Sequence, residues 1–179
     1  MDDLSRHHFW IALLGRQDHP TDGVEDYCTF LGQALKRRGI TLERVRLAWD
    51  EQGWISTLRL FRSDCVSWRG RWVLFQYTAL SWSQRGFPFR ALLVLGTLRR
   101  VGARVAVVFH EPARQTQSAR RWIDHFRGAC QDWVIHRLYK GASKCIFADP
   151  LKTIDWLSDV DTKSAFIPIG ANIPAIPLM

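Results

Sequence analysis

Two unbroken runs of apolar residues, 9–14 and 105–109, constrain this chain more than any other feature of its sequence. A strand that is covered on both faces reads as a continuous apolar run, whereas a strand with one face in water alternates. Both runs therefore predict central strands of a parallel sheet. Parallel strands need long crossover connections, which helices usually supply. The rest of the chain is expected to alternate strands with helices.

The segments around these runs follow that alternation. Apolar residues at helical spacing predict amphipathic helices at 23–38, 53–68 and 119–139, and a short apolar helix is expected at 91–100. Further strands are predicted at 40–47, 72–77, 144–148 and 165–169, with a short helix at 154–157. Right-handed crossovers then give an α/β domain, a single Rossmann-like doubly wound parallel sheet of about six strands with helices on both faces.

Aromatic residues in two of these segments carry specific expectations. The residues of helix 119–139 expected to face inward are Trp122, Phe126, Trp133 and Leu138. Residues 78–88 show no period and contain Trp82 and Phe87, which predicts an exposed loop whose aromatic side chains make contacts with a partner.

The composition fits a globular protein and leaves its partner open. Hydrophobic residues make up 47% of the 179 residues, and no apolar run reaches the ~18 residues of a membrane span. Neither a signal peptide nor a membrane span is expected, so the predicted location is the cytoplasm. The net charge of +8 makes an anionic partner plausible. Nucleic acid, anionic lipid headgroups and a nucleotide diphosphate all fit this charge, and so does a basic surface without a ligand.

The four cysteines do not point to a metal. Cys28, Cys65, Cys130 and Cys145 match neither the C-x-x-C motif nor the spacings of zinc sites, and most of them fall on apolar faces. We interpret them as reduced core thiols and predict no metal site.

The start of the first helix is a candidate anion site. Asp22 is a suitable N-cap, and Gly23 is expected to be the first helical residue. Because glycine has no side chain, a phosphate could approach the free N–H groups there, where the helix dipole favours an anion. The spacing matches neither common nucleotide-binding motif, and a capped helix without a ligand fits equally well.

Ligands of doubly wound sheets bind beyond the carboxyl ends of the strands. Three loops qualify, at 15–23, 76–88 and 110–118. His110 directly follows the most apolar strand, and the proline after Glu111 favours extended backbone there. These side chains could bind hydroxyls or handle protons, although a histidine after a strand is often only a hydrogen-bonding loop residue. The candidate site residues at these strand ends are Gly15, Asp18, His19, Asp22, Gly23, Gln76, Tyr77, His110 and Glu111.

Four segments of the sequence resemble one family. They are IALLGRQDHPTDGV at 11–24, LKRRG at 35–39, VFHEP at 108–112 and FIPIGANI at 166–173. Together they resemble the N-terminal half of the family-four glycosyltransferases of the GT-B fold, in which two Rossmann-like domains face each other. The resemblance covers essentially the whole chain.

This resemblance implies a function and a domain plan. Residues 1–170 would be the acceptor-binding domain and residues 171–179 the start of the interdomain linker, with the donor-binding domain absent. The enzyme would move a sugar from a nucleotide-sugar donor to a hydroxyl, with retention of configuration, and this chain would be inactive without that second domain. The family implies a catalytic role for His110 beside the transferred sugar, and contacts of Gly15, Asp22 and Gly23 with the donor diphosphate and the acceptor.

The resemblance also implies partners. The nucleotide-sugar is a substrate, and no permanently bound cofactor or metal is expected. The acceptor would be a sugar, either lipid-linked or a polysaccharide precursor. A lipid-linked acceptor suggests peripheral contact with the inner face of the membrane. The residues expected to make it are Trp82, Arg85, Phe87 and Arg90, together with the arginine-rich helix that begins near Arg120. The alternative function is a basic Rossmann-like module that binds nucleic acid or another anionic partner without catalysis, which the charge alone supports.

Overall fold

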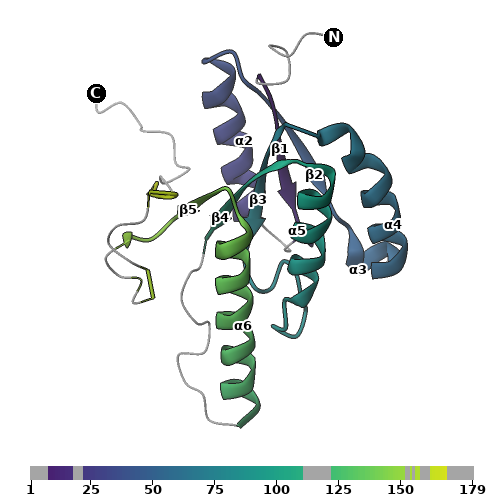
Figure 1. Cartoon of the computed structure of the whole chain (residues 1–179), viewed down its shortest axis with the longest axis vertical. Helices are drawn as coiled ribbons and strands as arrows, with labels where there is room; N and C mark the ends of the chain where they lie inside the picture. Colours follow the sequence, from purple (N-terminus) through teal and green to yellow (C-terminus); the bar gives the residue numbers. More distant parts are fainter. Residues whose placement is uncertain are drawn as a thin grey trace, which may run out of the picture.

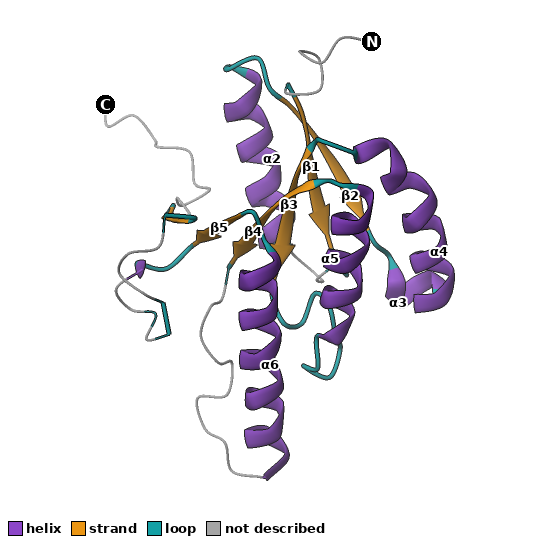
Figure 2. Ribbon diagram, viewed as in Figure 1, coloured by secondary structure: helices purple, strands orange, loops and turns teal. Residues whose placement is uncertain are grey.

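The computed structural model describes residues 8–17, 22–110, 122–151, 154, 156–157 and 162–168. Six parallel strands form one sheet in the order β2-β1-β3-β4-β5-β6 (Figures 1 and 2). The strands are β1 (Phe9–Leu14), β2 (Thr41–Arg46), β3 (Trp72–Tyr77), β4 (Arg104–Phe109), β5 (Lys144–Phe147) and β6 (Ser164–Phe166). The prediction of a doubly wound α/β fold is confirmed.

Helices cover both faces of the sheet because successive strand residues point to opposite sides. On one face, Ala12 and Leu14 of β1 pack with Cys28 of helix α2 (Gly23–Lys36). On the other face, residues such as Leu13 and Phe75 join a larger core. That core is closed by α4 (Trp54–Asp64), α5 (Phe89–Val101) and α6 (Trp122–Gly141).

The helix expected at 53–68 is divided in the structure. A four-residue helix, α3 (Trp49–Gln52), precedes α4, and the chain tightens into a 3₁₀ helix at Cys65–Trp68. Gly53 separates α3 from α4 because it has a φ of 78°, in a region that side-chain-bearing residues avoid. Phe61 and Cys65 are buried as the helical spacing predicted.

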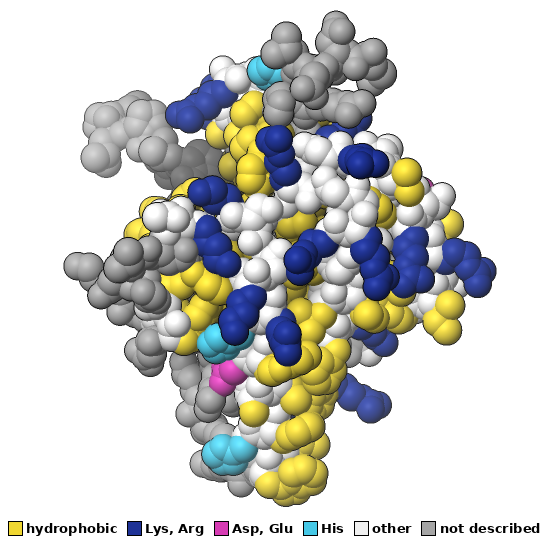
Figure 3. All heavy atoms as spheres, in the orientation of Figure 1, with side chains coloured by type: hydrophobic (Ala, Val, Ile, Leu, Met, Phe, Trp, Pro, Cys, Tyr) yellow, Lys and Arg dark blue, Asp and Glu magenta, His cyan; other side chains and the backbone are white. Residues whose placement is uncertain are grey.

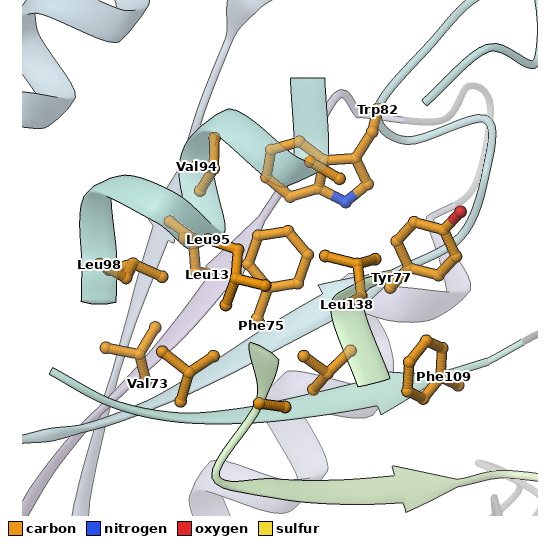
Figure 4. Packing of buried hydrophobic residues seen from close by; sticks show 14 of the residues in the cluster. Leu13, Val73, Phe75, Tyr77, Trp82, Val94, Leu95, Leu98, Phe109 and Leu138 are labelled. Atoms are coloured by element: carbon orange, nitrogen blue, oxygen red, sulfur yellow. The ribbon is translucent and has the colours of Figure 1, made fainter. Parts of the chain in front are cut away.

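The aromatic loop prediction was wrong for Trp82. This side chain is fully buried and stacks on Phe75 with ring centroids 4.7 Å apart (Figure 4). Its Nε1–H donates a hydrogen bond to the carbonyl oxygen of Gln76 at 3.0 Å. An indole whose only polar group has a partner can be buried at low cost, so lack of periodicity did not mean exposure.

The inward face predicted for α6 was also largely wrong. Trp122, Phe126 and Trp133 are 79%, 56% and 47% exposed, and only Leu138 is buried as expected. The buried stripe of α6 runs instead through Gly128, Gln131, Val134, Ile135 and Leu138. In Figure 2 the first turns of α6 extend past the end of the sheet, so their aromatic side chains have no sheet to pack on.

Two further predictions concern the end of the chain. The last strand covers 164–166 rather than 165–169, since Ile167 still donates its N–H to Phe147 but Pro168 has no N–H to continue the pairing. The short helix expected at 154–157 and the domain boundary at residue 170 lie partly or wholly outside the described residues. Among the residues that are described, no helix is both long and apolar enough to cross a bilayer.

Candidate functional site

His110 and Gln76 meet at the carboxyl ends of the two central strands β4 and β3. The Nε2 atom of His110 lies 2.7 Å from Oε1 of Gln76, and the Gln76 side chain is 1% exposed. The amide nitrogen of Gln76 donates to the carbonyl oxygen of Leu74 at 3.4 Å, which turns the amide oxygen toward His110. The oxygen can only accept, so Nε2 of His110 carries the proton and donates it.

Burial keeps His110 neutral. Loss of hydration lowers the pKa of the imidazole to about 4, and the negative charge of Asp22 opposes this shift only in part. The ring also meets the edge of Tyr27 from α2, with centroids 5.2 Å apart. The imidazole is thus held in one tautomer, with Nδ1 as a hydrogen-bond acceptor.

The N-terminus of α2 is occupied by the chain's own charges. The Oδ1 atom of Asp22 accepts hydrogen bonds from the N–H groups of Val24 at 3.2 Å and Glu25 at 3.0 Å. Arg46, the last residue of β2, donates to Oδ2 of Asp22 at 3.0 Å and to Oε2 of Glu25 at 2.7 Å. Asp22 is the N-cap that the sequence predicted. Two of the N–H groups expected to meet a phosphate are therefore already paired with a carboxylate.

Gly15 is required by packing within the chain. A Cβ atom at this position would lie 2.4 Å from the carbonyl oxygen of Ser81, closer than any real contact. The same oxygen accepts hydrogen bonds from the N–H of Arg16 at 2.9 Å and from Nε1 of Trp49 at 3.0 Å. Arg46 donates to the carbonyl oxygen of Gly15 at 3.2 Å. Ser81 thus ties together the segments that follow β1, β2 and β3.

Packing does not require a glycine at position 23. A Cβ atom there would meet no atom of the described residues within 4 Å, and the φ of Gly23 is not positive. The first residue of α2 therefore leaves an open approach, as the sequence predicted, without the chain itself requiring glycine.

Tyr77 does not join this group. It points to the opposite face of the sheet, where its ring packs edge-on against Phe109 at 5.7 Å. Its hydroxyl is buried with no hydrogen-bond partner among the described residues, and burial raises the pKa of the phenol.

The structure brings together some of the predicted site residues and adds others. We call His110, Gln76, Asp22, Glu25 and Arg46 the His110 cluster. Asp18, His19 and Glu111 lie outside the described residues. Sequence reasoning missed Arg46 and Tyr27. Arg46 could have been found, because it ends β2, and neighbouring parallel strands such as β1 and β2 end at the same edge of the sheet. Within the described part of the chain, no three His, Cys, Asp or Glu side chains are grouped to hold a metal.

Comparisons with known proteins identify no family. No family model matches the chain, and no curated protein matches it. Among solved structures, the chain is similar to the radical S-adenosylmethionine methyltransferase TsrM from Kitasatospora setae, described with cobalamin and a [4Fe-4S] cluster bound. The identity is 19% and the TM-score 0.40, over 57% of this chain and 18% of that chain. This chain thus spans less than a fifth of that enzyme's length.

Proposed function

We propose that this chain is the acceptor-side domain of a glycosyltransferase that moves a sugar from a nucleotide-sugar to a hydroxyl group. The observation that carries the proposal is the neutral, oriented imidazole of His110 at the edge of the sheet where ligands of such folds bind. The resemblance of its VFHEP segment to the family-four glycosyltransferases supports the same role.

The chemistry of His110 suits a hydroxyl ligand better than an anion. A neutral imidazole whose Nε2–H is already donated to Gln76 presents an acceptor at Nδ1, and a sugar hydroxyl is a donor. A phosphate would compete at the start of α2 with Asp22, whose carboxylate already accepts from the N–H groups of Val24 and Glu25 and is paired with Arg46. We therefore assign the His110 cluster to a sugar, and leave the diphosphate to a donor-binding domain or subunit.

The test is a transfer assay with the chain alone and with a donor-binding domain or subunit supplied. A panel of sugar nucleotides is supplied with a lipid extract and a polysaccharide precursor as acceptors. We expect sugar transfer only when a donor-binding partner is present. Robust turnover by the 179-residue chain alone would contradict the need for a second domain, and absence of transfer from every donor in the combined assay would contradict the function.

We further propose that the acceptor is presented at a membrane, through a surface other than the one expected from the sequence. Trp82 is buried and cannot reach a lipid surface. Exposed apolar side chains lie along α5 and α6, and we call them the aromatic α5–α6 face: Phe89, Leu93, Trp122, Ile123, Phe126 and Trp133. Phe89 and Trp133 meet across the two helices with centroids 6.0 Å apart, so the face is continuous there.

Basic side chains accompany this face. Arg137 lies over the ring of Trp133 at 5.2 Å, and Arg99, Arg137 and Lys140 line a groove between α5 and α6. In Figure 3, hydrophobic side chains gather in the lower part of the visible face, over α6, and Lys and Arg side chains gather above them. Aromatic residues beside cations favour an anionic lipid surface.

Cosedimentation with vesicles tests the membrane contact. Vesicles with anionic phospholipid should bind the chain, and Trp133→Ser should weaken binding several-fold, since it removes a large interfacial side chain. Ile55→Ser is the matched control, because it removes an exposed apolar side chain on α4. Equal binding to neutral vesicles, or no binding, would contradict the proposal.

A further inference from the structure

A pocket of about 510 Å³ lies between the segments that follow β2 and β3, and it shares no residue with the His110 cluster. Its walls come from α3, the start of α4, the loop between β3 and α5, and the first turn of α5. The volume is within the range of about 300–1,000 Å³ that is typical of small-molecule sites. The Trp49–Ser81 hydrogen bond of 3.0 Å holds one wall to the β3–α5 loop.

Arg90 is held in this pocket by two indole rings. Its guanidinium carbon lies 4.5 Å from the ring centroid of Trp49 and 5.2 Å from that of Trp54. Among the described residues it forms neither an ion pair nor a hydrogen bond, so its N–H donors have no acceptor there. The stacked arginine keeps a fixed position and can bind a carboxylate or phosphate through two parallel hydrogen bonds.

The surroundings of Arg90 also favour an anion. Arg85 also lines the pocket, so its walls carry two arginines and one acidic residue, Asp50. Arg90 belongs to the first turn of α5, and this turn has no side-chain cap and no acidic residue. The positive end of the α5 dipole is therefore uncompensated by its own helix, in contrast to α2, where Asp22 caps the helix.

The remaining walls fit a sugar ring. Trp54 and Phe87 are partly exposed aromatic side chains of the lining, and Gln84 and Asp50 offer hydrogen-bonding groups suited to hydroxyls. We propose that this pocket binds a hexose-sized ring that carries a carboxylate or a phosphate group. The proposal goes beyond glycosyl transfer and does not depend on it, because binding can be measured with this chain alone.

Isothermal titration calorimetry of the full chain tests the site with three probes: glucuronate, glucose 6-phosphate and glucose. At least one of the two anionic sugars should bind about tenfold or more tightly than glucose, since charge-assisted hydrogen bonds to arginine account for a difference of that order. The tighter of the two identifies the anionic group. Arg90→Gln should lower that affinity about tenfold or more, whereas Arg59→Gln, which removes one exposed arginine of α4, should leave it unchanged.

Arg90→Gln also removes packing against two indoles, so a second variant is needed. Arg85 is exposed, and Arg85→Gln should weaken binding several-fold while the thermal unfolding midpoint stays that of the wild type. Glucose that binds as tightly as the anionic sugars would overturn the proposal. So would the absence of binding by all three probes at millimolar concentration, or an equal loss in Arg59→Gln and Arg90→Gln.

Discussion

The amide of Gln76 sets the state of the His110 imidazole. The two side chains are 2.7 Å apart, and the second hydrogen bond of the amide, to Leu74, decides which of its atoms faces the ring. Because Gln76 is buried, this arrangement is built into β3 and needs no ligand.

Removing this amide should release the imidazole. Gln76→Leu leaves Nε2–H of His110 without its acceptor, which we expect to destabilise the fold by roughly 1–3 kcal/mol. Nitrogen-15 NMR of the histidine side chains measures the tautomer directly, and the wild type should show the Nε2–H form. A wild-type spectrum with the proton on Nδ1 would contradict the assigned hydrogen bond.

The low pKa of His110 predicts a pH dependence of stability. The pKa is about 4 in the folded chain against an ordinary 6.5, so the unfolded chain binds the proton more readily between these values. His110 therefore makes the free energy of unfolding fall as the pH drops from about 6.5 to about 4, by about 3 kcal/mol at most. Urea unfolding across this range should show a shallower dependence in His110→Gln. The exposed His125→Gln is the control and should keep the wild-type slope.

Arg46 should stabilise the start of α2 through both carboxylates. Its side chain is 21% exposed and that of Asp22 is 8% exposed, so solvent screens this pair only in part. We expect Arg46→Gln to cost about 1–2 kcal/mol of unfolding free energy, and a double-mutant cycle with Asp22→Asn to show coupling of about 1 kcal/mol. Arg44 lies 3.8 Å from Glu25 with a 45% exposed side chain, so Arg44→Gln should cost less than about 0.5 kcal/mol.

The two glycines of the first loop should respond oppositely to alanine. Gly15→Ala places a methyl group against the carbonyl of Ser81, and we expect a loss of about 2 kcal/mol or more in chemical denaturation. Gly23→Ala meets open space at the start of a helix, so its stability should equal or slightly exceed that of the wild type. If a substrate approaches Gly23, this stable variant should nevertheless lose transfer activity. Equal destabilisation by both changes would contradict the geometry of the loop.

The cysteines should differ in reactivity. Burial raises the pKa of the Cys28 and Cys145 thiols to about 12, and it also raises that of Cys65. Since the thiolate is the reactive form, these three should resist alkylation in the folded protein. Iodoacetamide labelling followed by mass spectrometry should modify Cys130, which is partly exposed, and label all four only in denaturant. Rapid labelling of Cys28 in the native chain would contradict its burial.

The sequence was sufficient for the sheet because burial on both faces leaves an unambiguous pattern, as in the adjacent residues Val107 and Val108 of β4, which are buried on opposite faces. The sequence pattern did not predict burial correctly in parts of the chain that lie outside the sheet, such as α6 and the loop after β3. Trp122 and Phe126 are aromatic like core residues, but they lie in the first turns of α6, past the end of the sheet. Trp82 lies in a loop, yet it is buried against Phe75, and its N–H has a backbone partner.

The sequence likewise predicted one part of the candidate site and missed another. Strand ends located His110 and Gln76, since the carboxyl edge of a parallel sheet follows from the topology. Their mutual hydrogen bond, and the capture of Asp22 by Arg46, depend on side-chain orientation, which hydrophobic periodicity does not encode.

The most direct test of the proposed function is the rate of sugar transfer by the chain with its donor-binding partner, compared between wild type and His110→Ala. Circular dichroism and the unfolding midpoint establish that the variant is folded. We expect turnover to fall by about two orders of magnitude or more, which is typical for the loss of an active-site group that handles a proton or hydrogen-bonds the reacting hydroxyl. Transfer by the folded variant at the wild-type rate would contradict a catalytic role for His110.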